Sequence, residues 1–299
     1  MLLADQSDEL ITSRRNPLVR RLRSLSSRAG RDEHGVVLLE GTHQLQELQH
    51  RVWQESVAFD VVATPTWLQA HAGLIRSLPG SVRVQRMSAE ALQAGLTTVQ
   101  PDGVACLLPL SCLPTAVPAP DFVLALDRIQ DPGNLGTLLR TARAADIQQV
   151  WCASGADPLA PKVVRSSAGA ILNLPVERFG LDPAEGVVQL AERLRQAREA
   201  GLQIVATLVP DAAADLSIQP YWELDWTLPT VLLLGNEGAG LDPLLQACCS
   251  HGVTLPHSSA VESLNVAAAA VPLLLERRRA RMTSSTQKIG RATPVSTSM

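Results

Sequence analysis

Three segments, two of which contain glycine-rich turns, each place polar side chains directly after an apolar run. They are LDRIQDPGNLGTLLR (126–140), VLLLGNEGAGLDP (231–243) and VTLPHSSAVESLNV (253–266). Glycine allows a ligand or another backbone to approach closely, and carboxamide, carboxylate and guanidinium groups can bind and orient a polar substrate. Their position after apolar runs predicts a ligand-binding site where neighbouring strands end.

Each segment also has a purely structural interpretation. The first two fit ordinary glycine turns between a strand and a helix, and Ser263 in the third fits a helix cap. Asn265 stands beside an apolar helix start, where burial without a hydrogen-bond partner would be costly, so we expect a specific partner for it. The patterns GxGxxG and GxxxxGK[ST] are absent, which excludes the dinucleotide fingerprint and the phosphate-binding P-loop.

The composition is that of a folded protein without a targeting or membrane segment. Among 299 residues, 46% are hydrophobic and 18% charged, and the net charge is −3. The first residues are acidic rather than basic, unlike a signal peptide, and the longest apolar span, Leu264–Leu275, is too short to cross a bilayer. Five cysteines without a CxxC pair predict neither a disulfide framework nor a zinc site. We therefore expect a soluble, cytoplasmic protein without a metal.

Alternating apolar runs and helical stretches predict two α/β regions. Strands are expected in the first region at 36–40, 57–64, 82–84 and 103–110, and in the second at 122–127, 150–154, 203–209, 230–235 and 252–256. The second set is apolar on both faces, which is typical of buried parallel strands. A proline-rich stretch between the regions cannot form a helix or an interior strand, so it is the predicted linker. The last helix is expected from 262 to 281.

The three segments resemble the three motifs of the SpoU (TrmH) RNA 2′-O-ribose methyltransferases, in the SPOUT superfamily. The motifs are GNLGTLLRTARA, LLLGNEGAGL and LPHSSAVESLNVAAAA, and the likeness covers about residues 122–281. The stretches ITSRRNPLVRRLRSL and GVVLLEGTHQLQEL, with Glu40-Gly41, more weakly resemble the substrate-binding domain that often precedes this catalytic domain. The sequence departs from the pattern at Ala267, where a serine commonly follows SLNV, and at Pro272.

The resemblance implies an α/β fold whose C-terminal parallel-sheet domain contains a trefoil knot, with a smaller N-terminal α/β domain that binds the substrate. It also implies S-adenosylmethionine as methyl donor and a homodimer. The expected parts are a basic N-terminal arm (1–31), the RNA substrate-binding domain (32–110), the proline-rich linker (111–120), the SpoU methyltransferase catalytic domain (121–281) and a disordered tail (282–299).

Residue roles follow from motif position. The resemblance places Gly235, Leu255 and Leu264 in the cofactor pocket, with Thr207 as a looser candidate, and it places Asn134, Arg140, Glu237, Ser263 and Asn265 at the catalytic face. Arg140 is expected to stabilise and orient the ribose 2′-hydroxyl, because a permanently protonated guanidinium is a poor general base. The other catalytic residues would position Arg140 and the ribose, and no metal is required.

The N-terminal region supplies an expected contact with RNA. Residues 11–31 contain seven arginines and no acidic residue. A helix is predicted over 17–28. The simplest interpretation of its arginines is a basic face exposed to solvent. We favour phosphate contacts, which are independent of sequence and sensitive to salt. The expected contact residues are Arg14, Arg15, Arg20, Arg21 and Arg23.

The sequence is compatible with several functions. The favoured one is 2′-O-methylation of a structured RNA, with ribosomal RNA ranked ahead of transfer RNA because of the extra N-terminal domain. A transfer-RNA 2′-O-methyltransferase and a non-enzymatic RNA-binding or ribosome-assembly factor on the same fold are the alternatives. A nicotinamide-dependent oxidoreductase shares only the α/β pattern and lacks the glycine fingerprint.

Overall fold

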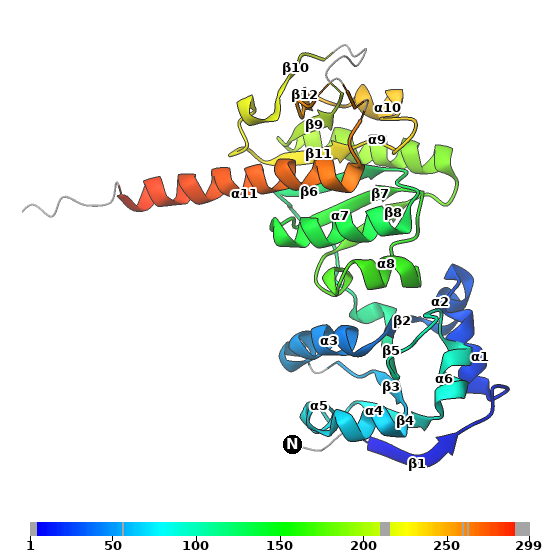
Figure 1. Cartoon of the computed structure of the whole chain (residues 1–299). Coiled ribbons are helices and arrows are strands. Elements are labelled where there is room, and N and C mark those ends of the chain that lie inside the picture. Colours follow the sequence, from blue (N-terminus) through cyan, green and yellow to red (C-terminus); the bar gives the residue numbers. More distant parts are fainter. Residues whose placement is uncertain (1–4, 56, 210–215, 259, 262, 291–299) are drawn as a thin grey trace, which may run out of the picture. The chain divides into compact units, whose positions relative to one another are not determined.

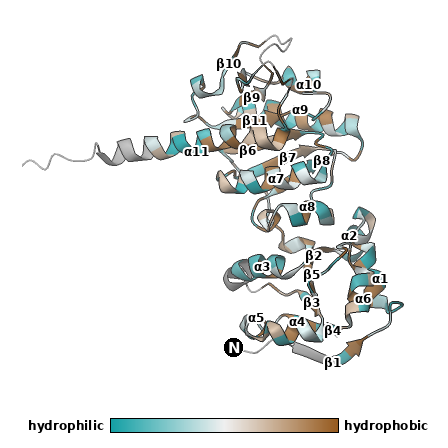
Figure 2. Ribbon diagram, in the orientation of Figure 1, coloured by the Kyte–Doolittle hydropathy of each residue, from teal (hydrophilic) through white to brown (hydrophobic). Residues whose placement is uncertain are grey.

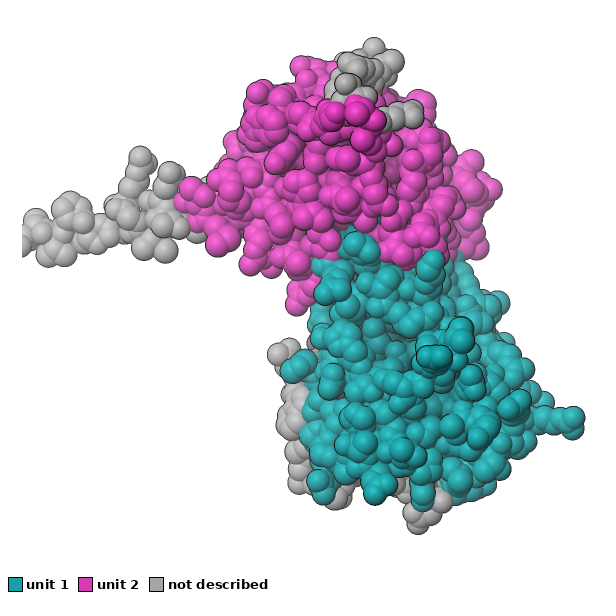
Figure 3. All heavy atoms as spheres, viewed as in Figure 1, with its two compact units in different colours: residues 1–115, 135–140, 156–175 teal, residues 116–134, 141–155, 176–299 magenta. Residues whose placement is uncertain are grey.

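The chain forms two compact units, which Figure 3 distinguishes by colour. The computed structural model describes residues 5–55, 57–209, 216–258, 260–261 and 263–290. The first unit contains Met1–Thr115, Leu135–Arg140 and Ala156–Pro175, and the second contains Ala116–Asn134, Thr141–Gly155 and Val176–Met299. Two stretches from the region of the methyltransferase motifs therefore pack with the N-terminal residues, which a division at the proline-rich linker did not anticipate.

A mixed five-stranded sheet in the order β1-β4-β3-β5-β2 forms the centre of the first unit. Its strands are β1 (Asp5–Ile11), β2 (Val36–Glu40), β3 (Asp60–Ala63), β4 (Arg83–Met87) and β5 (Val104–Pro109). The pairs β1–β4 and β3–β4 are parallel, and β5 is antiparallel to both β2 and β3. The four strands expected here are present, β2 with its expected bounds and the other three with shifted ends. The edge strand β1 was not predicted, because its acidic DQSDELI sequence is untypical of a strand.

Short helices cover this sheet (Figure 1). They are α1 (Pro17–Ser24), α2 (Arg28–His34), α3 (Thr42–Glu55), α4 (Pro65–Ala70), α5 (Ala72–Ser77), α6 (Ala89–Gly95) and α8 (Pro161–Ser166), with 3-10 turns η1 (Leu110–Cys112) and η2 (Ala170–Leu172).

The basic N-terminal region is built into the first unit instead of forming a separate arm. Val19, Leu22 and Leu25 are fully buried in one core cluster with residues of the sheet and of α6. The apolar side chains, at helical spacing, thus form a buried face, while the arginines lie on the opposite face. The helix expected over 17–28 is divided in two, because Ser27 accepts a hydrogen bond from Gly30 N at 3.1 Å and begins α2.

Two ion pairs connect residues 156–175 to the N-terminal part of the first unit. A guanidinium nitrogen of Arg165 on α8 lies 3.1 Å from the buried carboxylate of Glu40. Arg31 is 2% exposed and pairs with Asp157. A buried charge is tolerated when it is paired and hydrogen-bonded, so these contacts explain why the stretch packs with the N-terminal residues.

The second unit is built on a seven-stranded sheet in the order β10-β12-β9-β11-β6-β7-β8, with every pair parallel. Its strands are β6 (Phe122–Asp127), β7 (Gln149–Ala153), β8 (Val176–Phe179), β9 (Gln203–Thr207), β10 (Ile218–Pro220), β11 (Thr230–Leu234) and β12 (His251–Thr254). All five strands expected in this region are present. The edge strands β8 and β10 were not predicted, because they are short and only partly buried.

Helices lie on both faces of the parallel sheet (Figure 1). They are α7 (Pro132–Ala144), α9 (Pro183–Glu199), α10 (Pro243–Gln246) and α11 (Val266–Gly290), with a 3-10 turn η3 (Tyr221–Glu223). Figure 2 shows hydrophobic residues along the strands and hydrophilic ones on the outer faces of the helices. Val187, Leu190 and Leu194 of α9 pack into a core with apolar side chains of the central strands.

The last helix continues beyond its expected end at Arg281. α11 reaches Gly290, because the sequence after Arg281 contains no proline or glycine that would stop it earlier. The expected disordered tail (282–299) is therefore helical in its first part, and residues 291–299 lie outside the described residues.

Neither a membrane-spanning helix nor a group of metal ligands occurs among the described residues. Across the described ranges, every helix is too short or too polar to cross a membrane. The same residues include no cluster of three or more histidine, cysteine, aspartate or glutamate side chains that could hold a metal ion.

Candidate active site

The turns of the three segments leave the same edge of the second sheet. Because the strands are parallel, their carboxyl ends lie together. Strands β6, β11, β9 and β12 are consecutive neighbours, and they end at Asp127, Leu234, Thr207 and Thr254. The convergence expected from the sequence is thus present in the fold.

A cavity of about 440 Å³ lies among these strand ends. It is lined by all four residues expected to bind the cofactor, which are Thr207, Gly235, Leu255 and Leu264. The rest of the 235–241 loop and His257 also line it, and His257 was not predicted. The Nδ1 atom of His257 lies 2.8 Å from the carbonyl oxygen of Leu255. No motif glycine or carboxamide marked His257, and only its place two residues after Leu255 could have drawn attention to it.

Two features of the cavity suit a small polar ligand. Its volume falls within the range of ordinary ligand pockets. The hydroxyl oxygen of Thr207 is buried and has no hydrogen-bond partner within the described part of the chain. Such an atom is costly unless something pairs with it, so a bound ligand with a polar group would fit here.

Glycine is required where the pocket loop closes on itself. A Cβ atom at Gly235 would lie 2.7 Å from both the carbonyl carbon of Gly240 and the nitrogen of Leu241. Asn236 and Gly240 form an isolated antiparallel bridge, and Gly240 has φ +70°. The tight turn therefore depends on small residues at both of its ends.

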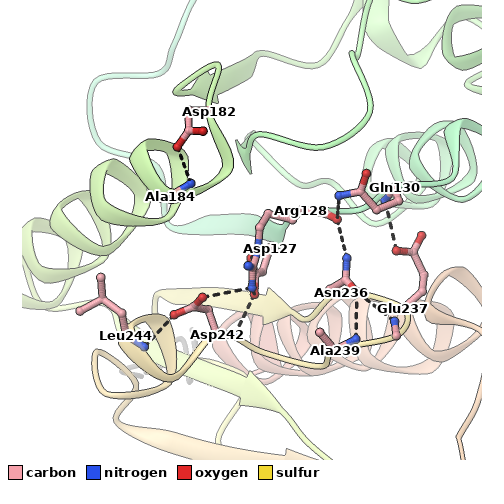
Figure 4. A network of polar contacts seen from close by, with 11 residues as sticks. Asp127, Arg128, Gln130, Asp182, Ala184, Asn236, Glu237, Ala239, Asp242 and Leu244 are labelled. Atoms are coloured by element: carbon pink, nitrogen blue, oxygen red, sulfur yellow. Dashed lines mark hydrogen bonds and ion pairs between the residues drawn. The ribbon is translucent and has the colours of Figure 1, made fainter.

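Glu237 joins the second turn to the first. Its carboxylate accepts a hydrogen bond from the backbone N–H of Gln130 at 3.1 Å (Figure 4). It also accepts from the backbone N–H of Asp131 at 3.3 Å and from the Asn134 side-chain amide at 3.1 Å. Partial burial acts to raise the pKa of Glu237, but these hydrogen bonds and one from its own backbone N–H outweigh it and lower the pKa. Glu237 is therefore a charged, fully engaged acceptor at neutral pH.

Asn265 joins the third turn to the first. Its side-chain nitrogen donates to the side-chain oxygen of Asn134 at 3.0 Å. Its own side-chain oxygen accepts from the backbone N–H groups of Ala267 at 2.9 Å and Ala268 at 3.2 Å. Asn265 thus caps α11, the role that the sequence suggested for Ser263, and it has the specific partner that was expected. Ser263 is exposed and lines the cavity.

Arg140 lies on α7, six residues after Asn134. Its side chain is exposed, and within the described ranges its guanidinium makes no hydrogen bond or ion pair. It is therefore available to a bound anion or hydroxyl. Asp131 caps the start of the same helix by accepting from Asn134 N at 2.8 Å.

The arginines expected to contact RNA differ in their exposure to solvent and in their hydrogen bonds. Arg14, Arg15 and Arg20 are exposed, and Arg21 is partly buried. Arg23 is exposed but donates from Nε and Nη2 to the carbonyl oxygen of Ala94, at 3.1 and 2.9 Å. The first three are therefore the best placed to meet an external phosphate.

Comparison with known proteins assigns the chain to a class. A model of the SpoU rRNA Methylase family matches residues 121–274, and a model of the MRM3-like substrate binding domain matches residues 16–106. An uncharacterized tRNA/rRNA methyltransferase from Synechocystis is 38% identical over 92% of this chain and 96% of that protein. The 23S rRNA (guanosine(2553)-2′-O)-methyltransferase RlmP from Bacillus subtilis is 29% identical over 90% of this chain and 98% of that protein.

A solved structure supports the same class of protein. The crystal structure of an AdoMet-bound rRNA methyltransferase from Sinorhizobium meliloti superposes with a TM-score of 0.71 and 26% identity, covering 91% of this chain and 97% of that chain.

Fold and site define a SPOUT-type RNA methyltransferase, and the chain belongs to the SpoU rRNA Methylase family. It is an enzyme that uses S-adenosylmethionine. The family, the fold class with its N-terminal substrate-binding domain, and the cofactor that the resemblance implied are thereby confirmed. The nicotinamide-dependent alternative is excluded by this membership.

The close packing at Gly235 gives a first prediction. In Gly235→Ala the new methyl group meets backbone atoms that cannot move aside without opening the turn, so we expect S-adenosylmethionine to bind about tenfold more weakly, a loss of ~1.4 kcal/mol. Isothermal titration measures it. Gly73→Ala is the control, because Gly73 is exposed on α5, does not line the cavity, and has no atom within 4 Å of the Cβ it would gain. Equal affinities for the two variants would contradict the prediction.

Proposed function

We propose that this enzyme transfers a methyl group to a ribose 2′-hydroxyl in ribosomal RNA. The observation that carries the proposal is the hydrogen-bonded series Glu237–Asn134–Asn265, which ties three turns together beside the cavity that fits the cofactor. The 23S rRNA 2′-O-methyltransferase named above, which shares most of its length with this chain, supports ribosomal RNA as the target. A transfer-RNA target has less support, and a non-enzymatic role does not agree with membership of this enzyme family.

Within this proposal, the pocket residues hold the cofactor. The backbone groups of Gly235, Leu255 and Leu264 and the unpaired hydroxyl of Thr207 would bind it. S-adenosylmethionine supplies the methyl group on a sulfonium, so the protein must bring a ribose oxygen into line with it.

The catalytic residues position the ribose and stabilise charge on it. Arg140 would orient the 2′-hydroxyl and stabilise the negative charge that develops on its oxygen. Asn134, Asn265 and Ser263 would fix the ribose and the guanidinium by hydrogen bonds. Because both oxygens of Glu237 accept hydrogen bonds from the first turn, we assign it to holding that turn.

Replacing Arg140 tests the proposed function. In Arg140→Ala we expect methyl transfer to fall by at least about 100-fold, the usual cost of losing a charge-stabilising donor, while cofactor affinity is retained. The assay incubates purified protein with labelled S-adenosylmethionine and total RNA and identifies the modified nucleotides.

Arg143→Ala is the control for this assay, because Arg143 is also exposed on α7. A label on a base instead of a ribose would refute the reaction, and full activity of Arg140→Ala would refute the role of Arg140.

We also propose that Arg14, Arg15, Arg20, Arg21 and Arg23 contact RNA phosphates, with the exposed Arg14, Arg15 and Arg20 contributing most. Each phosphate contact adds about 0.7–0.9 to the slope of log affinity against log salt concentration. The triple variant R14A/R15A/R20A should therefore lower this slope by about 2–3 in filter binding to ribosomal RNA.

Arg76→Ala is the matched control for the RNA variant. Arg76 is exposed on α5, at the side of the first unit away from α1 in Figure 1. An unchanged slope in the triple variant, or an equal loss in the control, would contradict the proposed contact surface.

The homodimer implied by the resemblance is part of the proposal. Val271, Leu275 and Met282 are exposed apolar side chains at spacings that place them on one face of α11, a surface suited to a second copy. Sedimentation velocity of the purified protein should give twice the chain mass, and a monomer at micromolar concentration would contradict it. The trefoil knot, the cytoplasmic location and a catalytic domain bounded at 121–281 stay predictions.

A further inference from the structure

A fully buried carboxylate lies at the end of β6, just outside the cavity. Asp127 has no exposed surface. Its oxygens accept from Nε of Arg128 at 2.6 Å, from Nη2 of Arg128 at 3.1 Å and from the backbone N–H of Asp242 at 2.8 Å. A buried charge requires such pairing, so Asp127 depends on Arg128 as its counter-ion.

Arg128 has an unusual backbone conformation. Its φ is +51°, in the left-handed region that non-glycine residues rarely adopt. Such conformations persist only where surrounding contacts enforce them, and they cluster at functional sites. The hydrogen bond to Asp127 raises the pKa of Arg128, although partial burial opposes the shift.

Arg128 contacts the pocket loop at both of its ends. Its carbonyl oxygen accepts from the side-chain amide of Asn236 at 2.8 Å. Its Nη2 atom lies 3.1 Å from the Asp242 carboxylate, whose other oxygen accepts from Leu244 N at 3.0 Å and begins α10. Figure 4 shows Arg128 between Asp127, Asn236 and Asp242. We call this set of contacts the Arg128 clasp.

The loop between these two contacts forms a wall of the cavity. Residues 235–241 all line it, whereas Arg128 is not among the lining residues. Asn236 also accepts from Gly238 N at 2.9 Å and Ala239 N at 3.0 Å, so its side chain folds the loop from within while its amide nitrogen is held by Arg128. Loss of the guanidinium would release the Asp242 end of this wall directly, and the Asn236 end would then depend only on the main-chain carbonyl of residue 128.

We propose that Arg128 is a positioning residue for methyl transfer, which fixes the 235–242 loop in its ligand-binding shape before the cofactor arrives. The inference rests on the proposed assignment of the cavity to S-adenosylmethionine. Its physical basis is preorganisation, since a loop that is already ordered loses less entropy on binding. A site whose supporting contacts are loose binds and orients its ligand poorly.

The test uses full-length protein and two variants. Arg128→Ala removes the guanidinium and leaves Asp127 without a counter-ion. The double variant D127N/R128Q removes both charges together, so it provides a folded comparison if the single variant unfolds. Arg195→Ala is the matched control, because it breaks an exposed ion pair with Glu192 in the same unit, away from the cavity.

Hydrogen exchange of the protein without cofactor is the first readout. Amides of the 235–242 loop should exchange at least about fivefold faster in both Arg128 variants, while those of the central strands keep their protection. In titrations and steady-state kinetics with S-adenosylmethionine, Kd and KM should rise about tenfold. At saturating cofactor, kcat should change much less, which a general loss of structure would not produce.

Wild-type loop exchange in whichever Arg128 variants are folded would overturn the inference, as would a wild-type Kd for the cofactor in them. Failure of the wild-type protein to bind S-adenosylmethionine would instead refute the pocket assignment. The exchange data would in that case still decide whether Arg128 orders the loop.

Discussion

The carboxylate of Glu237 is the interaction on which the site depends. A parallel sheet brings the three turns to one edge, but it does not fix their distances from one another. Glu237 does so for two of them, because one charged group accepts hydrogen bonds from two backbone amides and one side-chain amide of the 130–134 turn. Asn134 in turn accepts a hydrogen bond from Asn265, which links the first turn to the start of α11.

The site residues have two different roles in this arrangement. Most hydrogen bonds of Glu237, Asn134 and Asn265 are made to one another and to backbone groups, so these residues hold the turns in place. Arg140 and the hydroxyl of Thr207 have no such partner within the residues that the structure describes, which leaves them for ligands. A methyltransferase needs both, because an in-line transfer depends on geometry more than on a strong base.

The sequence predicted the parts of the fold that local pattern determines. Runs that are apolar on both faces identified the five inner strands of the second sheet, whereas β8 and β10 were missed because edge strands lack that pattern. The motif residues were found because glycines and carboxamides follow those runs directly. That Asn265 caps α11 and also binds Asn134 was not predictable, since the two residues are 131 positions apart in the chain.

Domain boundaries were the least predictable feature, because they depend on long-range contacts. The proline-rich linker is a sound local signal, yet the pairing of Arg165 with the buried Glu40 draws residues 156–175 into the first unit. Val19, Leu22 and Leu25, which lie in the basic arm expected at 1–31, are likewise buried in the core of the first unit, which the charge pattern alone did not indicate.

The most direct measurement is a crystal structure of the protein with S-adenosylmethionine. We expect electron density for the cofactor along the backbone of Gly235, Leu255 and Leu264, with its methyl group turned toward Asn134 and Asn265. Density at any other place on the chain, with this cavity holding only solvent, would contradict it.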